Sequence, residues 1–322
     1  MTGCPECSTE IAPDSLSCPQ CRRLTRSADL EALAQRAKAA WRVGNFAEER
    51  SLWQQSLNLL PPNTAQYAKI QARLAELDEQ SAIASGDPAS GGWRKGAAGI
   101  GPALVLLLTK GKALLLGLTK VGTVLTMAAS LGVYWGLYGW GLAIGVIFSI
   151  YIHEMGHVIA IRHYGFKASA PMFIPGLGAF IRMRGVRLPP IPDSRIGLAG
   201  PVYGLGAALV ALAIYYATHV KVWGAVAHFG AMINLFNLIP IWQLDGSRGV
   251  RSLTRAQRGL VLTAAAVLWA LTSNSMVFLV GAVCAYRLFT PDWQKEPDNP
   301  GVFQFVGLLA ALTLVMVLAP PK

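Results

Sequence analysis

The stretch SIYIHEMGHVIAI, residues 149–161, reads as part of an apolar helix that crosses a bilayer, yet it carries His153, Glu154 and His157. Ionisable side chains at the centre of a bilayer cost about 2.5–3.5 kcal/mol each on insertion scales, so their presence there indicates a function. Residues four apart on a helix lie on one face, one turn apart. Both imidazoles can therefore bind one metal ion, with the carboxylate of Glu154 beside them.

This spacing is the HExxH pattern of zinc hydrolases, in which two histidines bind zinc and the glutamate acts as general base. A five-residue pattern also arises by chance, and the alternative is a pair of hydrogen-bonded core histidines beside a buried Glu154. That alternative is costly in lipid, because no neighbouring residue neutralises the carboxylate. A catalytic zinc takes three protein ligands and keeps one position open for water, so the pattern requires one further ligand.

The composition indicates a membrane protein. Of the 322 residues, 53% are hydrophobic and 14% are charged, whereas ordinary soluble proteins have about 25% charged residues. Residues 1–95 carry 11 basic and 11 acidic residues, and residues 96–322 carry 17 and 6. A basic, apolar half is typical of loops that face an anionic cytoplasmic membrane surface. We expect the lipid bilayer, and not nucleic acid, as its partner, because the arginines lie between apolar spans.

The apolar runs predict an all-α polytopic domain with about seven transmembrane helices, each about 20 residues long. The expected spans are residues 122–138, 140–161, 196–216, 222–241, 253–272, 276–289 and 302–319. Residues 101–118 are also apolar, but Lys110 and Lys112 lie at their centre. We expect this stretch to lie at the interface or to re-enter the membrane without spanning it.

The basic residues predict the orientation of these spans. If the first span leads outward, the loops after residues 161, 241 and 289 are cytosolic, whereas the outer turns carry only Lys221. The basic residues on the cytosolic side are Arg162, Lys167, Arg182, Arg184, Arg187, Arg195, Arg248, Arg251, Arg255, Arg258 and Lys295. Cytosolic loops carry such an excess of Lys and Arg. The first residues also lack the basic start and apolar run of a secretory signal. We therefore predict a multi-pass protein of the cell membrane with its N-terminus in the cytosol.

The third ligand is expected among the few acids of this domain. Between residues 97 and 291 the acids are Glu154, Asp193 and Asp245. Asp245 lies in NLIPIWQLDGSR, residues 237–248, three residues before the cytosolic Arg248, and His157 lies a few residues before the cytosolic Arg162. Both therefore fall at a similar depth on the same side. Asp245 also suits an ordinary turn before a glycine, but the match in depth favours a ligand.

Three motifs together resemble the site-2 protease family of intramembrane zinc metalloproteases over about residues 100–290. They are IHEMGH, AGP at residues 199–201 and NLIPIWQLDG. The resemblance implies that His153, His157 and Asp245 bind the catalytic zinc and that Glu154 deprotonates the zinc-bound water. It also implies that Asn237 orients the substrate or stabilises the oxyanion, where the simpler alternative is a helix-packing contact. Family members often continue LDGG, whereas this chain has LDGS, which leaves the ligand intact.

Residues 170–185, APMFIPGLGAFIRMRG, resemble the family's membrane-associated β-hairpin with a Gly-x-Gly element, here Gly176 and Gly178. An open strand edge could bind an unwound substrate segment by β-addition, because a helical substrate keeps its carbonyls in its own hydrogen bonds. An ordinary connecting hairpin fits the sequence equally well. Asp193 and Ser194 follow, and we expect them to cap the third span.

The N-terminal segment carries two CxxC pairs separated by ten residues. The four cysteines are Cys4, Cys7, Cys18 and Cys21. Two such pairs can complete one tetrahedral zinc site, and a disulfide or redox pair is the alternative. We predict a cytosolic zinc ribbon over residues 1–27 with a structural zinc, in addition to the catalytic one.

Residues 28–81 are predicted to be helical. Their spacing resembles that of a tetratricopeptide repeat at Gly44, Phe46, Trp53, Leu57 and Pro61. A helical hairpin of no particular family fits equally well. Residues 1–80 are in either case a candidate surface for a cytosolic protein partner. Residues 82–97, rich in Gly, Ser, Ala and Pro, predict a linker before a transmembrane metalloprotease domain at residues 98–322.

These expectations combine into an intramembrane zinc metalloprotease that hydrolyses peptide bonds within or near the transmembrane segments of protein substrates. One alternative is a catalytically silent zinc-binding scaffold that captures transmembrane segments. The intact Glu154 argues against it, because a scaffold needs no base. Another is a membrane metallohydrolase that acts on lipid or prenylated protein, against which the LDG element argues.

Overall fold

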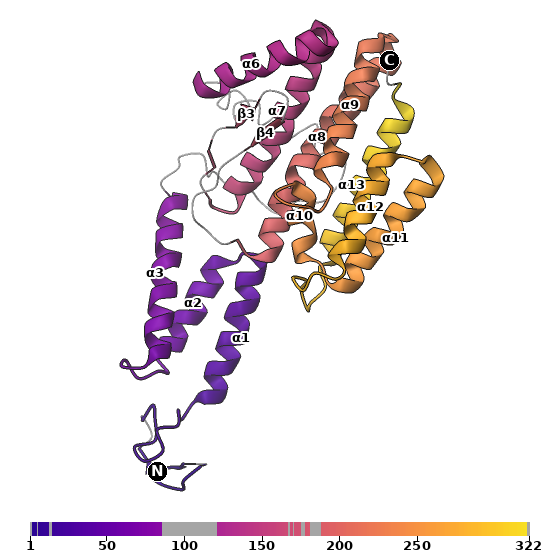
Figure 1. Ribbon diagram of the computed structural model, residues 1–322. Helices are drawn as coiled ribbons and strands as arrows, with labels where there is room; N and C mark the ends of the chain where they lie inside the picture. Colours follow the sequence, from indigo (N-terminus) through magenta and orange to yellow (C-terminus); the bar gives the residue numbers. More distant parts are fainter. Residues whose placement is uncertain are drawn as a thin grey trace. The chain divides into compact units, whose positions relative to one another are not determined.

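The computed structural model describes residues 2–4, 6–12, 15–85, 121–166, 168–169, 171–174, 178–180 and 188–320. The chain is mostly helical and divides into two compact units, Met1–Ala89 and Ser90–Lys322 (Figure 1). The division falls within the segment expected to be a linker. Residues 86–97 and 101–118 lie outside the described residues, so the linker and the interfacial segment stay predictions.

The first unit contains a two-stranded sheet and three helices. Strands β1 (Thr2–Gly3) and β2 (Glu10–Ile11) pair antiparallel, and the helices are α1 (Ser27–Val43), α2 (Phe46–Leu57) and α3 (Ala65–Ser85). Gly44 ends α1 in a left-handed conformation, and the side chain of Asn45 then caps α2 by accepting a hydrogen bond from the Glu48 backbone N–H. A glycine C-cap followed at once by an Asn N-cap gives the short turn of a helical hairpin.

The second unit is built from helices and one short strand pair. Its elements are α6 (Val121–Tyr138), α7 (Trp140–His163), β3 (Met172–Ile174), β4 (Gly178–Phe180), α8 (Pro190–Thr218), α9 (Lys221–Asn237), α10 (Asp245–Gly249), η1 (Val250–Ser252), α11 (Arg255–Thr272), α12 (Ser275–Arg287) and α13 (Asn299–Leu318). Helices α7 and α8 pack together, as do α8 and α9, and α6 crosses one end of α7 (Figure 1).

Three of these helices, α7, α8 and α13, are long and apolar enough to cross a membrane, and shorter apolar helices cover Val124–Tyr138 and Ser275–Arg287. The expected count of seven spans is not confirmed among the described residues. Helices α9 and α12 have 17 and 13 residues, fewer than the roughly 20 that cross a hydrocarbon core. At α9, α11 and α12 the apolar run extends into the turns at the helix ends, so it overstates the length of the helix.

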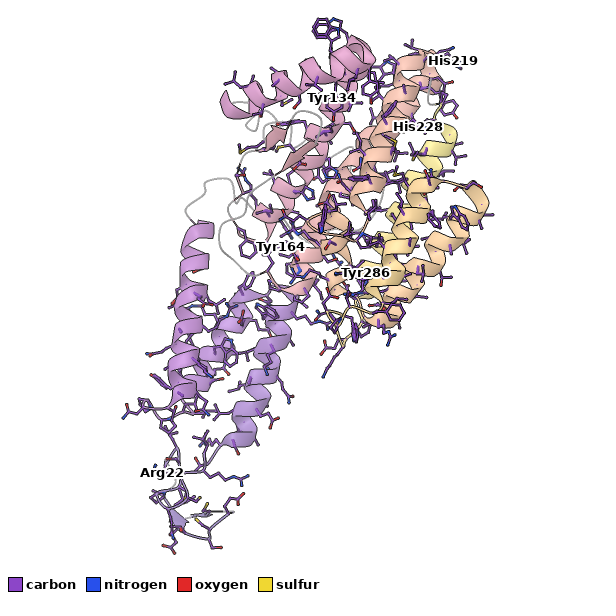
Figure 2. The ribbon with its side chains drawn as sticks, in the orientation of Figure 1. Arg22, Tyr134, Tyr164, His219, His228 and Tyr286 are labelled. Carbon is purple, nitrogen blue, oxygen red and sulfur yellow. The ribbon has the colours of Figure 1, made fainter. Side chains whose placement is uncertain are left out.

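The core of the second unit lies where α8, α9, α11, α12 and α13 meet. Its fully buried side chains include Leu198, Leu235, Val261, Val280 and Phe305. Figure 2 shows Tyr134, His219 and His228 at one end of this unit and Tyr164 and Tyr286 nearer the other end. Tyr134 and His219 thus share one end of this unit.

The strands β3 and β4 pair antiparallel with Met172 opposite Phe180 and Ile174 opposite Gly178. Strand β3 contacts α6, and β4 contacts α7. Gly178 thus begins β4, whereas Gly176 lies outside the described residues. The membrane association of this strand pair and its contact with a substrate stay predictions.

A buried arginine ties the ends of α11 and α12 together. The side chain of Arg258 is fully buried and donates to the Arg287 carbonyl at 2.9 Å and to Asp292 at 2.7 Å. Burial alone would raise the pKa of Asp292, but the hydrogen bond and charge of Arg258 outweigh it and hold that pKa below its usual range. The ion pair therefore stabilises the folded protein at neutral pH.

We expect Asp292→Asn to lower the thermal unfolding midpoint in detergent at pH 7, because it leaves the Arg258 charge buried without its carboxylate. The loss corresponds to about 1–3 kcal/mol. A lowered folded-state pKa gives stability that is present above the unfolded value of about 3.9 and is lost as pH falls through the folded value. The difference between variant and wild type should therefore shrink below about pH 4.

Lys295→Gln, at an exposed position of the same loop, is the matched control and should leave the midpoint unchanged. A difference between Asp292→Asn and wild type that stays constant down to pH 3 would contradict the ion-pair explanation.

Candidate metal centre

Helix α7 carries two histidines and a glutamate inside the protein. The side chains of His153, Glu154 and His157 are 4%, 6% and 7% exposed. The two imidazoles meet edge to face, with their Nε2 atoms 3.2 Å apart. One turn of helix separates them, so the local geometry follows directly from the spacing.

Asp245 is the first residue of α10 and reaches both histidines. Its Oδ2 lies 3.0 Å from His153 Nε2, and its Oδ1 lies 3.2 Å from His157 Nε2. The ligand atoms of the three residues lie within 4.8 Å of one another. Ligands about 2.0–2.1 Å from a tetrahedral zinc lie about 3.3 Å apart. Two imidazole nitrogens and a carboxylate at these separations fit one zinc ion and leave a fourth position.

Hydrogen bonds behind the rings fix which nitrogen of each histidine faces Asp245. The Nδ1 atom of His157 lies 2.8 Å from the carbonyl oxygen of Ile196. A carbonyl only accepts, so His157 Nδ1 must donate, which leaves the lone pair of Nε2 free for a metal ion. Such partners set the tautomer and orientation of metal-binding histidines.

Asn234 fixes the tautomer and orientation of the His153 ring in the same way. Its Nδ2 donates to the Gly230 carbonyl at 2.7 Å, so its Oδ1 faces His153 Nδ1 at 2.7 Å and accepts from it. Asn234 is 1% exposed. Asn234 was not among the residues expected from the sequence. Asn237, expected to orient the substrate or stabilise the oxyanion, is half-buried at the last position of α9. An amide in an otherwise apolar stretch of α9 was the signal that could have revealed Asn234.

Two glycines of α8 make room for this arrangement. A Cβ at Gly200 would overlap His157 Nε2 and lie 2.6 Å from His153 Nε2, and a Cβ at Gly204 would overlap the Asn234 amide. Gly200 belongs to the AGP motif, and Gly204 lies one turn further along the same face. The backbone of α8 therefore passes directly against the ligand nitrogens.

Asp193 anchors the short helix that carries Asp245. It accepts a hydrogen bond from Arg248 Nε at 2.8 Å and forms an ion pair with Arg251. Ser194 adds a hydrogen bond from its hydroxyl to the Gly249 carbonyl at 2.8 Å. The expectation that Asp193 and Ser194 cap the third span is wrong. Helix α8 begins earlier, at Pro190, because proline is favoured in the first helical turn.

The chain between α9 and α10 returns closely upon itself. A Cβ at Gly246 would overlap the carbonyl of Leu238, which follows the last residue of α9. Only glycine allows this approach, which explains why a glycine follows Asp245. The close contact holds Asp245 at the end of α9, near His153, which is hydrogen-bonded to Asn234 of the same helix.

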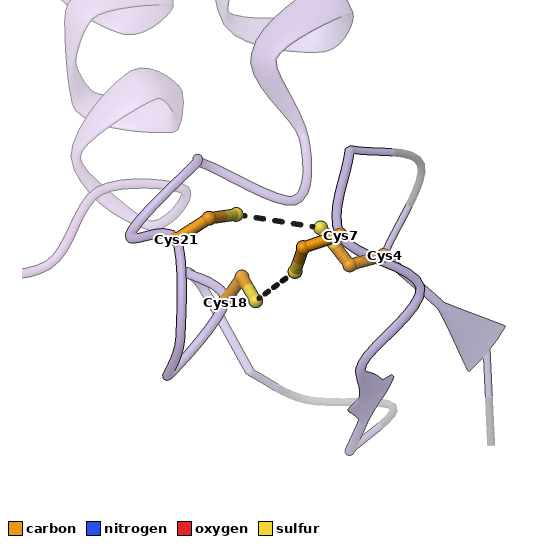
Figure 3. Close-up of side chains that lie close together, drawn as sticks. All are labelled: Cys4, Cys7, Cys18 and Cys21. Carbon is orange, nitrogen blue, oxygen red and sulfur yellow. Dashed lines mark hydrogen bonds between the residues drawn. The ribbon is translucent and has the colours of Figure 1, made fainter.

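The four N-terminal cysteines converge in the first unit (Figure 3). The Sγ atoms of Cys4 and Cys21 lie 3.5 Å apart, as do those of Cys7 and Cys18. A disulfide needs about 2.05 Å, and all four cysteines are free. Their sulfur atoms lie within 4.8 Å of one another, which fits a site for four thiolates.

The backbone repeats itself around the two cysteine pairs. The carbonyls of Cys4 and Cys18 accept from the residues four positions later, and their amides donate to the residues five positions later, all at 2.8–2.9 Å. Ser8 and Arg22, at equivalent positions, both have φ of 59°. The two CxxC segments thus form equivalent knuckles that face one another.

Comparison with known proteins agrees with this geometry. Residues 141–222 match the family model described as Peptidase family M50, and this range contains His153, Glu154, His157, Gly200 and Gly204. The chain contains a peptidase M50 domain. This chain is 27% identical over 126 residues to the zinc metalloprotease MJ0392 of Methanocaldococcus jannaschii.

That alignment covers 37% of this chain and 36% of the archaeal protein, so the chain spans about a third of the length of this relative. No solved structure matches the chain.

The fit of α8 against the histidines gives a sharp test. We expect Gly200→Ala to abolish zinc binding at this centre, because its Cβ would occupy the space beside both Nε2 atoms. Zinc is counted by elemental analysis in a background carrying Cys4→Ser and Cys18→Ser, which removes metal from the cysteine cluster.

Gly206→Ala, on the same helix with open space around it, is the matched control and should keep one zinc per chain. Retention of zinc by Gly200→Ala would show that α8 does not pack against the ligands as described.

The anchoring of α10 predicts an effect on affinity. We expect Asp193→Asn to weaken zinc binding by about 10–100-fold, as removal of outer-shell partners commonly does. Competition with a chromophoric chelator, in the same background of Cys4→Ser and Cys18→Ser, measures the affinity.

Asp298→Asn is the matched control for Asp193→Asn, because it also replaces a buried, ion-paired aspartate. Asp298 is buried and accepts from Arg195 of α8 at 2.6 Å and from the Gly301 amide. It links α8 to α13, not to α10. Its replacement should leave zinc affinity close to wild type, so equal losses in both variants would contradict a specific role for Asp193.

Proposed function

We propose that this chain is an intramembrane zinc metalloprotease that hydrolyses peptide bonds within or near the transmembrane segments of membrane proteins. The observation that carries the proposal is the convergence of His153, His157 and Asp245 with both Nε2 lone pairs directed at the same space. Three ligands leave one position for water, the pattern of a catalytic and not a structural zinc. The three long apolar helices support action in the membrane.

Each residue has a role in this proposal. A zinc ion held by His153, His157 and Asp245 would lower the pKa of water and polarise the substrate carbonyl. Glu154 accepts the proton of the attacking water and returns it to the leaving amine. Asn237 orients the substrate or stabilises the oxyanion, while Asn234 positions His153.

The burial of Glu154 also argues against a catalytically silent scaffold. Its carboxylate is 6% exposed, and no hydrogen bond to it exists within the described part of the chain. A buried carboxylate without a structural partner is expensive and is explained by a catalytic role. A scaffold that only captures transmembrane segments would gain nothing from it.

The remaining parts of the proposal concern the surroundings of the centre. The strand pair β3–β4 offers an edge for an unwound substrate segment. In the sequence, Gly176 lies between the two strands and Gly178 begins β4; both contribute to this substrate site. The cysteine knuckles hold a second, structural zinc. The chain lies in the cell membrane in several passes with a cytosolic N-terminus, and residues 1–80 bind a cytosolic protein partner.

We expect Glu154→Gln to reduce cleavage of a labelled single-span protein substrate by at least 1,000-fold, within the range that loss of a general base produces together with its charge. Cleavage is followed by gel electrophoresis with purified full-length protein in lipid vesicles. The zinc content of the variant should equal that of wild type, because Glu154 is not a ligand.

Chelation of zinc should abolish wild-type cleavage, and added zinc should restore it. Equal cleavage by wild type and Glu154→Gln would contradict the mechanism. Cleavage at the wild-type rate by an Asp245→Ala variant would remove Asp245 from the ligand set.

A further inference from the structure

Trp242 stands out in the loop between α9 and α10. Its side chain is 90% exposed, the highest value among the large apolar residues of the described chain. It lies three residues before the candidate ligand Asp245. An exposed tryptophan beside a metal centre contacts either a substrate or the surrounding membrane, and the backbone distinguishes the two.

The backbone of Trp242 adopts a conformation that an aromatic residue rarely takes. Its φ is +51°, in the left-handed region that glycine and asparagine favour. The amide of Leu244 donates to the Ile241 carbonyl at 3.2 Å, so Trp242 occupies the second position of a tight turn. A glycine would take this position without strain.

The other positive-φ residues of the described chain each have a structural reason. Ser8 and Arg22 complete the cysteine knuckles, and His219 and Ser273 end helices α8 and α11 in left-handed caps. Trp242 belongs to neither class. Strain without a structural reason is concentrated at functional sites.

The loop is also held firmly at both ends. Ile239 is buried, Leu244 packs on the main core, and Gly246 lies against the Leu238 carbonyl. The strained turn is therefore imposed by its surroundings, and it directs the indole of Trp242 outward from a fixed base.

The position of Trp242 matches the path of a peptide at the metal centre. Three extended residues span at most about 10 Å, so Trp242 lies within this distance of Asp245 along the chain. A substrate in extended conformation covers the same distance with the three residues beside its scissile bond. Substrates drawn from transmembrane segments are rich in large apolar side chains, and an indole offers them a broad apolar surface.

We propose that Trp242 is a specificity-determining residue that packs against a large apolar side chain of the substrate within about three residues of the scissile bond. This inference rests on the proposed protease function. A lipid contact is the weaker alternative, because exposed tryptophans such as Trp135 and Trp140 lie on apolar helices and need no strained turn.

The test uses full-length protein in lipid vesicles and a single-span substrate whose large apolar residues near the scissile bond are replaced one at a time by alanine. Wild type should cleave the parent substrate with a higher kcat/KM than one of these alanine substrates. Trp242→Gly, which relieves the strained φ, should lower kcat/KM for the parent at least tenfold and abolish that preference. Trp242→Phe should retain most of it.

Folding and the metal centre are checked separately. Trp242→Gly should keep its zinc and unfold at the same or a higher temperature than wild type. Trp140→Ala, at the first residue of α7 and 53% exposed, should leave the substrate preference unchanged.

The outcomes separate the two proposals. If wild type cleaves and Trp242→Gly retains the preference, or loses activity equally on every substrate, Trp242 contacts lipid or serves the fold, and this inference is overturned while the protease function stands. If wild type cleaves no substrate and Glu154→Gln behaves identically, the protease function is overturned and the inference falls with it.

Discussion

The close packing of α8 against α7 is the constraint on which the metal centre depends. A Cβ at Gly156 of α7 would lie 2.5 Å from the Ala199 carbonyl of α8, so the two backbones nearly touch. This approach places the Ile196 carbonyl behind His157 and Gly200 in front of both Nε2 atoms. The same helix holds α10 through Asp193. One helix therefore sets a tautomer, the space for a metal ion and the position of Asp245, the candidate third ligand.

The few acids of the second unit show how charge is retained in an apolar protein. Asp193 is neutralised by Arg248 and Arg251, and Asp245 faces two imidazoles. Glu154 lies beside the same imidazoles, but it has no hydrogen bond or ion pair in the described part of the chain. Burial of a charge is unfavourable unless it is paired and hydrogen-bonded, so Glu154 is the acid that requires a chemical explanation.

The two metal-ligand clusters differ in ways that follow from their donors. Four thiolates on two equivalent knuckles form a closed set, which suits a structural zinc, whereas two imidazoles and one carboxylate leave a position open. The cysteine cluster is built from backbone turns within 20 residues of sequence. The histidine cluster requires residues of four helices, α7, α8, α9 and α10, so its geometry depends on packing between segments that are distant in the sequence.

The sequence by itself determined the features that depend on local spacing: the common face of His153 and His157, and the two cysteine pairs. It also pointed to Asp245, because acids are rare and its expected depth matched that of the histidines. Only the tertiary structure decided that Asn234, Ile196 and Gly200 surround the ligands, that Asp193 anchors α10, and that fewer helices than expected have spanning length. The physical reason is that helical periodicity acts over four residues, whereas the bonds to His157 and His153 join residues 39 and 81 positions apart.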